Sequence, residues 1–228
     1  MSQYAFVGQA SAISAVSAGS IAVTYSPTAG NHLMIVVRAS LSDTVTMSDN
    51  LGGGASSNVY NAFANAGNVT DAYFLYGFYA PNCKGGSTTF TATYSLTTAA
   101  SAIYVGEYSG VALVANPLVG SGQGYVLAPG GSSNVIGSSA ASPSQVPCLL
   151  WGFCGGTGAI TNPPVAGTSF GGQASVWGST AIAEDVLDVL TVSQNASFTA
   201  GALSGSADYA VLMGQFVLTP TLMGQACL

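Results

Sequence analysis

Residues that could support acid–base, nucleophilic or metal chemistry are scarce in this chain. Its 228 residues include eight Asp or Glu, two Lys or Arg and one His, and charged residues make up 4% of the total, against about 25% in an ordinary soluble protein. A Ser-His-Asp triad would need His32, which opens the apolar run HLMIVV directly after a turn. No GxSxG nucleophile motif is present, so we do not expect a hydrolase of this type.

Two acidic sites in the first half could have a function: the group Asp43, Asp49 and Asn50, and Glu107. Asp43, Asp49 and Asn50 flank a Gly-rich turn and offer the oxygen ligands that calcium prefers. Their spacing is sparse, however, and Asp or Asn beside Gly also serves the turn's own backbone, which is the interpretation we favour. Glu107 lies in an otherwise apolar strand; we favour a carboxylate hydrogen-bonded to a neighbouring strand or loop over a general acid.

A third acidic group lies at Glu184, Asp185 and Asp188. A glycosidase uses a pair of carboxylates, one with a raised pKa, in a cleft. Here the nearest aromatic residue is Trp177 and basic helpers are almost absent. We therefore expect an acidic, solvent-exposed edge and no catalytic residues.

The four cysteines do not form a metal or redox motif. They lack any CxxC spacing and have a single histidine for company, so no zinc site is expected. Cys148 and Cys154 lie six apart in a predicted strand, about 20 Å when extended, which is too far for a disulfide. Buried thiols or one cross-link, such as Cys83 with another strand, stay open, as does the state of Cys227. No cofactor and no metal are expected.

Frequent turn residues and few helix signals predict an all-β fold, which we expect to be a two-sheet antiparallel β-sandwich, jelly-roll-like, in one domain spanning 1–228. The segment 181–190 has helical periodicity as an alternative, but we favour a strand because no N-cap box precedes it. Predicted strands are 3–8, 20–25, 32–38, 44–48, 57–63, 71–80, 87–95, 101–109, 147–154, 174–179, 182–192 and 208–218.

The net charge of −6 excludes some partners. Nucleic acids and anionic membranes attract clustered Lys and Arg, and here only Arg38 and Lys84 exist. The N-terminal segment has no positive region before its mildly apolar stretch, so it does not read as a signal peptide. A spanning helix would need about 18 consecutive apolar residues, and we expect no membrane insertion.

The strand at 71–80 is apolar on both faces, whereas an antiparallel strand usually keeps one face wet. Something must cover the second face, which carries Tyr73, Leu75 and Tyr79: a long loop of the same chain, a sugar stacked on the tyrosines, or another subunit. The strand at 208–218 is similarly two-sided. We expect Tyr73, Leu75 and Tyr79 to form a subunit interface, because low charge also removes the repulsion that keeps proteins apart.

The segment Val105–Val111, read as VGEYSGV, follows a Thr-alternating strand and an earlier TMSDN turn. This pattern resembles β-sandwich domains of secreted bacterial and phage-associated proteins that carry a V-x-E-Y-S-G strand. The resemblance is clearest over residues 32–118. It implies a jelly-roll or lectin-like sandwich and brings no catalytic motif.

These observations favour a non-enzymatic structural subunit of an extracellular assembly or virion, such as a phage capsid-decoration or tail protein or a surface filament. Its expected partners are further copies of itself and other virion or surface proteins. The alternative is a carbohydrate-binding or adhesin module that stacks glycan on Tyr and Trp. An enzyme explains nothing that these two leave open.

Overall fold

The computed structural model describes residues 4–39, 43–51, 57–68, 73–98, 100–126, 134–156, 165–166, 171–172, 177, 180–188, 192–200 and 209–219. These residues form sixteen β-strands and no helix. The all-β prediction is confirmed. The segment at 181–190 is a strand, since β14 (Ala181–Asp188) pairs along its length with β11 (Cys148–Gly156).

The first eight strands form a jelly-roll-like sandwich. Its larger sheet has the order β1-β8-β3-β6-β5 and its smaller sheet the order β2-β7-β4, both antiparallel. The strands are β1 (Ala5–Ser14), β2 (Ala18–Tyr25), β3 (His32–Ala39), β4 (Val45–Asp49), β5 (Asn61–Asn68), β6 (Tyr73–Ala80), β7 (Thr88–Thr98) and β8 (Ser101–Ser109).

The second eight strands form a second sandwich with the same connectivity. The larger sheet has the order β9-β16-β11-β14-β13 and the smaller one β10-β15-β12, so each strand of the first sandwich corresponds to the strand eight places later. The remaining strands are β9 (Leu118–Val126), β10 (Asn134–Gly137), β12 (Val165–Ala166), β13 (Gly171–Gly172), β15 (Ser197–Ala200) and β16 (Tyr209–Val217).

The internal repeat extends to residue detail. Segments 88–108 and 196–216 align without gaps and are identical at six of 21 positions, including Phe-Thr-Ala at Phe90 and Phe198. The ends of these segments read Gly-Glu-Tyr and Gly-Gln-Phe. The first strand of each sandwich, β1 or β9, also has a register shift at the equivalent place, next to its pairing with Glu107 or Gln215. The two sandwiches are therefore equivalent in topology and in register.

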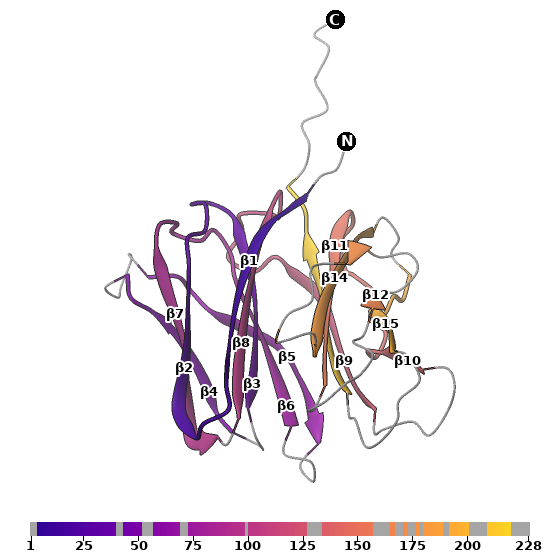
Figure 1. The fold of residues 1–228 in the computed structure, drawn as a ribbon. Helices are drawn as coiled ribbons and strands as arrows, with labels where there is room; N and C mark the ends of the chain where they lie inside the picture. Colours follow the sequence, from indigo (N-terminus) through magenta and orange to yellow (C-terminus); the bar gives the residue numbers. More distant parts are fainter. Residues whose placement is uncertain are drawn as a thin grey trace, which may run out of the picture.

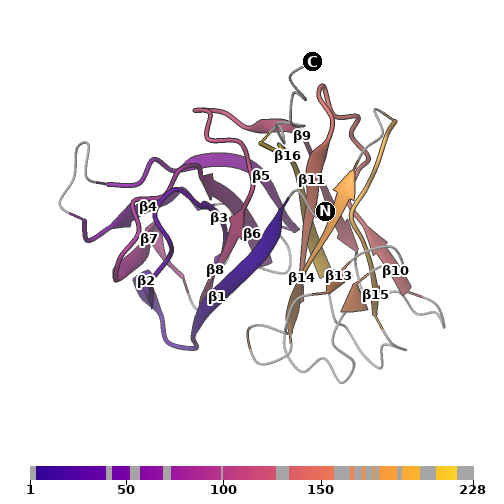
Figure 2. The same ribbon diagram turned by 90° about the horizontal axis from the view of Figure 1, so that it is seen from above.

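The four sheets stack as four layers (Figures 1 and 2). The two larger sheets lie in the middle and face each other, while the smaller sheets cover the outside. Separate cores fill each sandwich, and a third core fills the space between the larger sheets.

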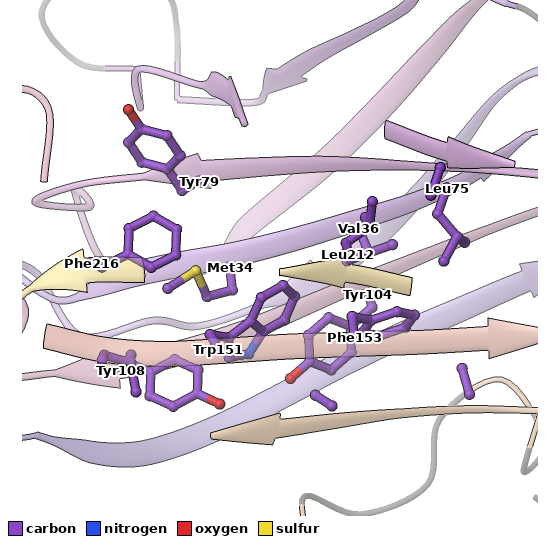
Figure 3. Packing of buried hydrophobic residues seen from close by; sticks show 14 of the residues in the cluster. Met34, Val36, Leu75, Tyr79, Tyr104, Tyr108, Trp151, Phe153, Leu212 and Phe216 are labelled. Atoms are coloured by element: carbon purple, nitrogen blue, oxygen red, sulfur yellow. The ribbon is translucent and has the colours of Figure 1, made fainter. Parts of the chain in front are cut away.

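This shared core combines side chains of both halves (Figure 3). Met34, Val36 and Tyr104 come from the first sandwich, and Trp151 and Phe153 come from the second. Tyr104 stacks against Trp151 with ring centroids 6.4 Å apart. The two central strands of each larger sheet are thus buried on both faces, which explains their nearly continuous apolar sequences.

Several strands of the second half escape sequence-based prediction. Strand β9, LVGSGQGYV, alternates with glycine where β-propensity favours branched side chains. At Gly122 a side-chain methyl would collide with the carbonyl oxygen of Ser139, and at Gly124 with that of Gly137. The glycines let the chain after β9 pass directly over the strand, so close packing determines this sequence.

Replacing Gly122 by Ala should destabilise the protein by about 2 kcal/mol, because the new methyl has no space beside the Ser139 backbone. Urea unfolding of Gly122→Ala and of Ser121→Ala, an exposed neighbour on the same strand, provides the comparison. Equal stability of the two variants would contradict the close approach.

Candidate functional site

Glu107 closes one end of the first sandwich. Its carboxylate accepts hydrogen bonds from Tyr25 Oη at 2.6 Å, the Thr28 amide at 2.9 Å and the Asn31 side chain, and its side chain is 1% exposed. Burial by itself raises the pKa of the carboxyl, but these hydrogen bonds outweigh it and leave the pKa below its usual value. Glu107 therefore anchors the loop between β2 and β3, as the sequence-based interpretation expects.

Asp49 performs the same task for the loop after β4. It accepts hydrogen bonds from the backbone amides of Leu51 and Asn58, both at 3.0 Å, and from Tyr60 Oη at 2.7 Å. Burial raises its pKa, and the bonds from Tyr60, Asn58 and Leu51 lower it to a net value below the usual one. The carboxylate serves the turn's backbone, as expected for Asp beside Gly.

Asp43 and Asn50 have similar local partners. Asp43 accepts hydrogen bonds from the Ser95 hydroxyl and the Leu96 amide, and Asn50 accepts one from the Thr89 amide at 2.8 Å. Within the described ranges, no group of three or more His, Cys, Asp or Glu side chains lies close enough to hold a metal ion.

The prediction of an exposed acidic edge at Glu184 and Asp185 is wrong. Both side chains are buried, and they point to opposite faces of β14. Glu184 accepts a hydrogen bond from the Ser197 amide at 2.9 Å, while Asp185 accepts hydrogen bonds from Tyr4 and Tyr108 at 2.9 and 3.0 Å. They are not arranged as a catalytic pair. The side chain of Asp188 lies outside the described residues.

His32 is buried in the shared core, stacked on Tyr79 at a centroid distance of 5.6 Å. Neither ring nitrogen has a hydrogen-bond partner in the described part of the chain. Burial lowers the pKa of His32 to about 3, so the ring is neutral. It has no serine or carboxylate hydrogen-bonded to it there and functions as a packing residue.

Three of the cysteines, Cys83, Cys148 and Cys154, are buried, and Cys227 lies outside the described residues. Cys148 and Cys154 lie on the extended strand β11, as predicted. Burial raises the pKa of Cys154 and of Cys83, which leaves both thiols protonated and unreactive.

Leu75 and Tyr79 do not lie on a free surface. They are 0% and 3% exposed in the isolated chain because the second sandwich covers them (Figure 3). Their expected role as a subunit interface is therefore wrong: the covering partner belongs to the same chain. The side chain of Tyr73 lies outside the described residues. Trp151 and Trp177 are also buried in the shared core, so neither can stack on a ligand at the surface.

A largely apolar hollow lies at one end of the first sandwich. Val59, Pro81, Leu113, Val114 and Ala115 line this apolar cup together with Asn82 and Lys84, around about 250 Å³. Three of its side chains are unusually exposed for their type: Val59 at 65%, Leu113 at 60% and Val114 at 52%. Sequence analysis missed the cup because its residues come from three separate loops.

Hydrogen bonds to buried groups hold those loops in place. Asp49 binds Asn58, the neighbour of Val59, and the Asn58 side chain accepts a hydrogen bond from the Lys84 amide at 2.9 Å. Tyr79 donates to the Asn116 side chain at 2.7 Å and thereby fixes the link between the two sandwiches, which carries Leu113 and Val114. The loops that form the cup are therefore held in place by hydrogen bonds.

The chain matches no protein-family model, no curated protein and no solved structure. Among the described residues, no helix is long and apolar enough to cross a membrane.

The two lowered carboxyl pKa values predict acid sensitivity. Glu107 and Asp49 bind a proton less readily in the folded than in the unfolded chain. Their stabilising contribution is complete above the unfolded pKa values of about 4 and is lost as the pH falls through the lower folded values. Urea unfolding between pH 7 and pH 3 should show this loss.

The double variant Glu107→Gln, Asp49→Asn should lose less stability over the same pH range, because it lacks both carboxyls. Its stability at pH 7 should be lower than that of the wild type by about 2 kcal/mol or more, since charge-assisted hydrogen bonds are weakened. An unchanged pH dependence would show that other groups govern acid unfolding.

Proposed function

We propose that this protein is a non-enzymatic structural subunit of an extracellular assembly or virion, such as a phage capsid-decoration or tail protein or a surface filament. It self-associates through the apolar cup. The observation that supports this proposal best is the contrast between a closed interior and an apolar exterior site: the described buried carboxylates hold loops and strands, while Val59, Leu113 and Val114 face solvent.

The charge of the chain supports the same proposal. With a net charge of −6 spread over 228 residues and 4% charged residues, electrostatic repulsion between copies is weak. Lys84 is one of the lining residues of the cup, and a second copy of the chain docked there would carry a net negative charge. Contact would then depend on apolar burial, at about 25 cal/mol per Å², and would persist at high salt.

The test is the oligomeric state of the full chain at micromolar concentration, measured by light scattering and negative-stain microscopy. Wild-type protein should form oligomers or filaments in both low and high salt. Leu113→Asp should raise the protein concentration needed for assembly at least tenfold, because it places a charge in the apolar contact. Leu96→Asp is the matched control, since Leu96 is 65% exposed on β7 and does not line the cup.

A wild-type protein that stays monomeric at all concentrations would contradict self-association. Equal effects of Leu113→Asp and Leu96→Asp would show that the cup is not the contact. Because both side chains are exposed, neither variant should lower the unfolding temperature by more than a few degrees.

A further inference from the structure

A second surface lies where the edges of the two larger sheets meet. Strand β5 ends the larger sheet of the first sandwich, β9 ends that of the second, and the two strands lie in contact. Figure 1 shows β5, β6 and β9 converging between the two halves. Two hollows of about 380 and 360 Å³ open along this seam, and both are lined by Asn65 and Gln123. Because they share these two lining residues, the hollows lie next to each other, and we call them together the seam groove.

Aromatic rings form one wall of the groove. Phe74 lines the first hollow and Tyr76 the second, and their ring centroids lie 6.2 Å apart with an angle of 30° between the planes. Both are half-buried. Tyr76 is held in place because its hydroxyl accepts a hydrogen bond from the Asp43 amide at 3.0 Å. The two rings, two residues apart on one strand and tilted by 30°, form an aromatic platform.

Neutral hydrogen-bonding groups lie beside the aromatic rings: Asn65 is the cross-strand neighbour of Tyr76, and Gln123 comes from β9. Gln123 and Asn65 are exposed, and Gln123 already accepts a hydrogen bond from the Asn65 amide at 3.4 Å. Tyr125 and Gly67 also border the first hollow. Among the residues that the structure describes, no Asp, Glu, Lys or Arg lines either hollow. The described lining therefore offers no charged group to an ionic ligand.

We infer that this seam groove binds an uncharged saccharide chain. The apolar face of a sugar ring stacks on an aromatic platform, and its hydroxyls pair with amides. Combined, the hollows fall in the range of small-molecule sites. An extended peptide fits less well, because adding a strand requires an open sheet edge, and β9 already lies against the edge of β5. The site is distinct from the apolar cup and does not depend on self-association.

Isothermal titration of the full-length protein with maltohexaose, cellohexaose and N-acetylchitohexaose at millimolar concentration tests the inference. At least one should bind, with an affinity that does not change between low and high salt. Phe74→Ala should weaken that binding about tenfold, as expected for one lost stacking ring, and Asn65→Ala should weaken it severalfold. Leu96→Ala, at an exposed position outside the groove, should bind like the wild type.

Thermal unfolding of each variant separates a local effect from loss of the fold. Phe74→Leu adds a second control, because it keeps an apolar side chain but removes the flat ring; it should also bind weakly. Failure of all three saccharides to bind, or wild-type affinity in folded Phe74→Ala protein, would overturn the inference. Since these titrations do not measure assembly, such a result would leave self-association through the cup standing.

Discussion

The rest of the structure depends on the burial of two large sheets against each other. Each sheet also packs on a smaller sheet behind it, so the central strands β3, β8, β11 and β16 have no face in contact with water. Antiparallel strands usually alternate between apolar and polar residues, but a doubly covered strand does not. The shared core therefore requires apolar side chains on both faces of these strands. It also explains how so few charged residues suffice, because a large part of the chain never meets solvent.

The sequence shows that both faces of these strands must be buried, but it does not show which segment covers them. The two-sided strand at 71–80 shows that its second face must be covered, and composition alone cannot distinguish another subunit from another part of the same chain. The covering sheet begins about 40 residues later, after strands β7 and β8 and a link that has no helical or strand pattern. Short-range periodicity carries no information about which sheets face each other, so the sequence alone predicts a surface position for Leu75 and Tyr79, which are buried.

Prediction succeeded where local patterning dominates. Most strands of the first half, and β11, β14 and β16, alternate or run apolar in the expected way. It failed for β9, β10 and β15, where glycine or short polar residues meet a close-packed backbone. The repeat had a signal, the paired Phe-Thr-Ala and Gly-Glu-Tyr or Gly-Gln-Phe motifs. That signal lies at a spacing of 108 residues, far longer than the periods of common solenoid repeats.

The two halves have diverged, and the surfaces that we propose for function lie at their junction. Tyr108 and Glu107 correspond to Phe216 and Gln215, so a carboxylate in the first half is replaced by an uncharged amide at the equivalent position of the second. The apolar cup includes the link between the sandwiches, and the seam groove lies between their edge strands. A single sandwich would have neither surface. Joining the two units therefore creates both of the proposed surfaces as well as the core.

Native-state hydrogen exchange, compared with urea unfolding followed by tryptophan fluorescence, tests this account most directly. Both tryptophans lie in the shared core, so their fluorescence reports its disruption. If the two sandwiches depend on that core, amides of β3 and β8 will exchange with the same free energy as amides of β11 and β16, equal to the global value. Protection that persists in one half after the tryptophans have become exposed would contradict the account.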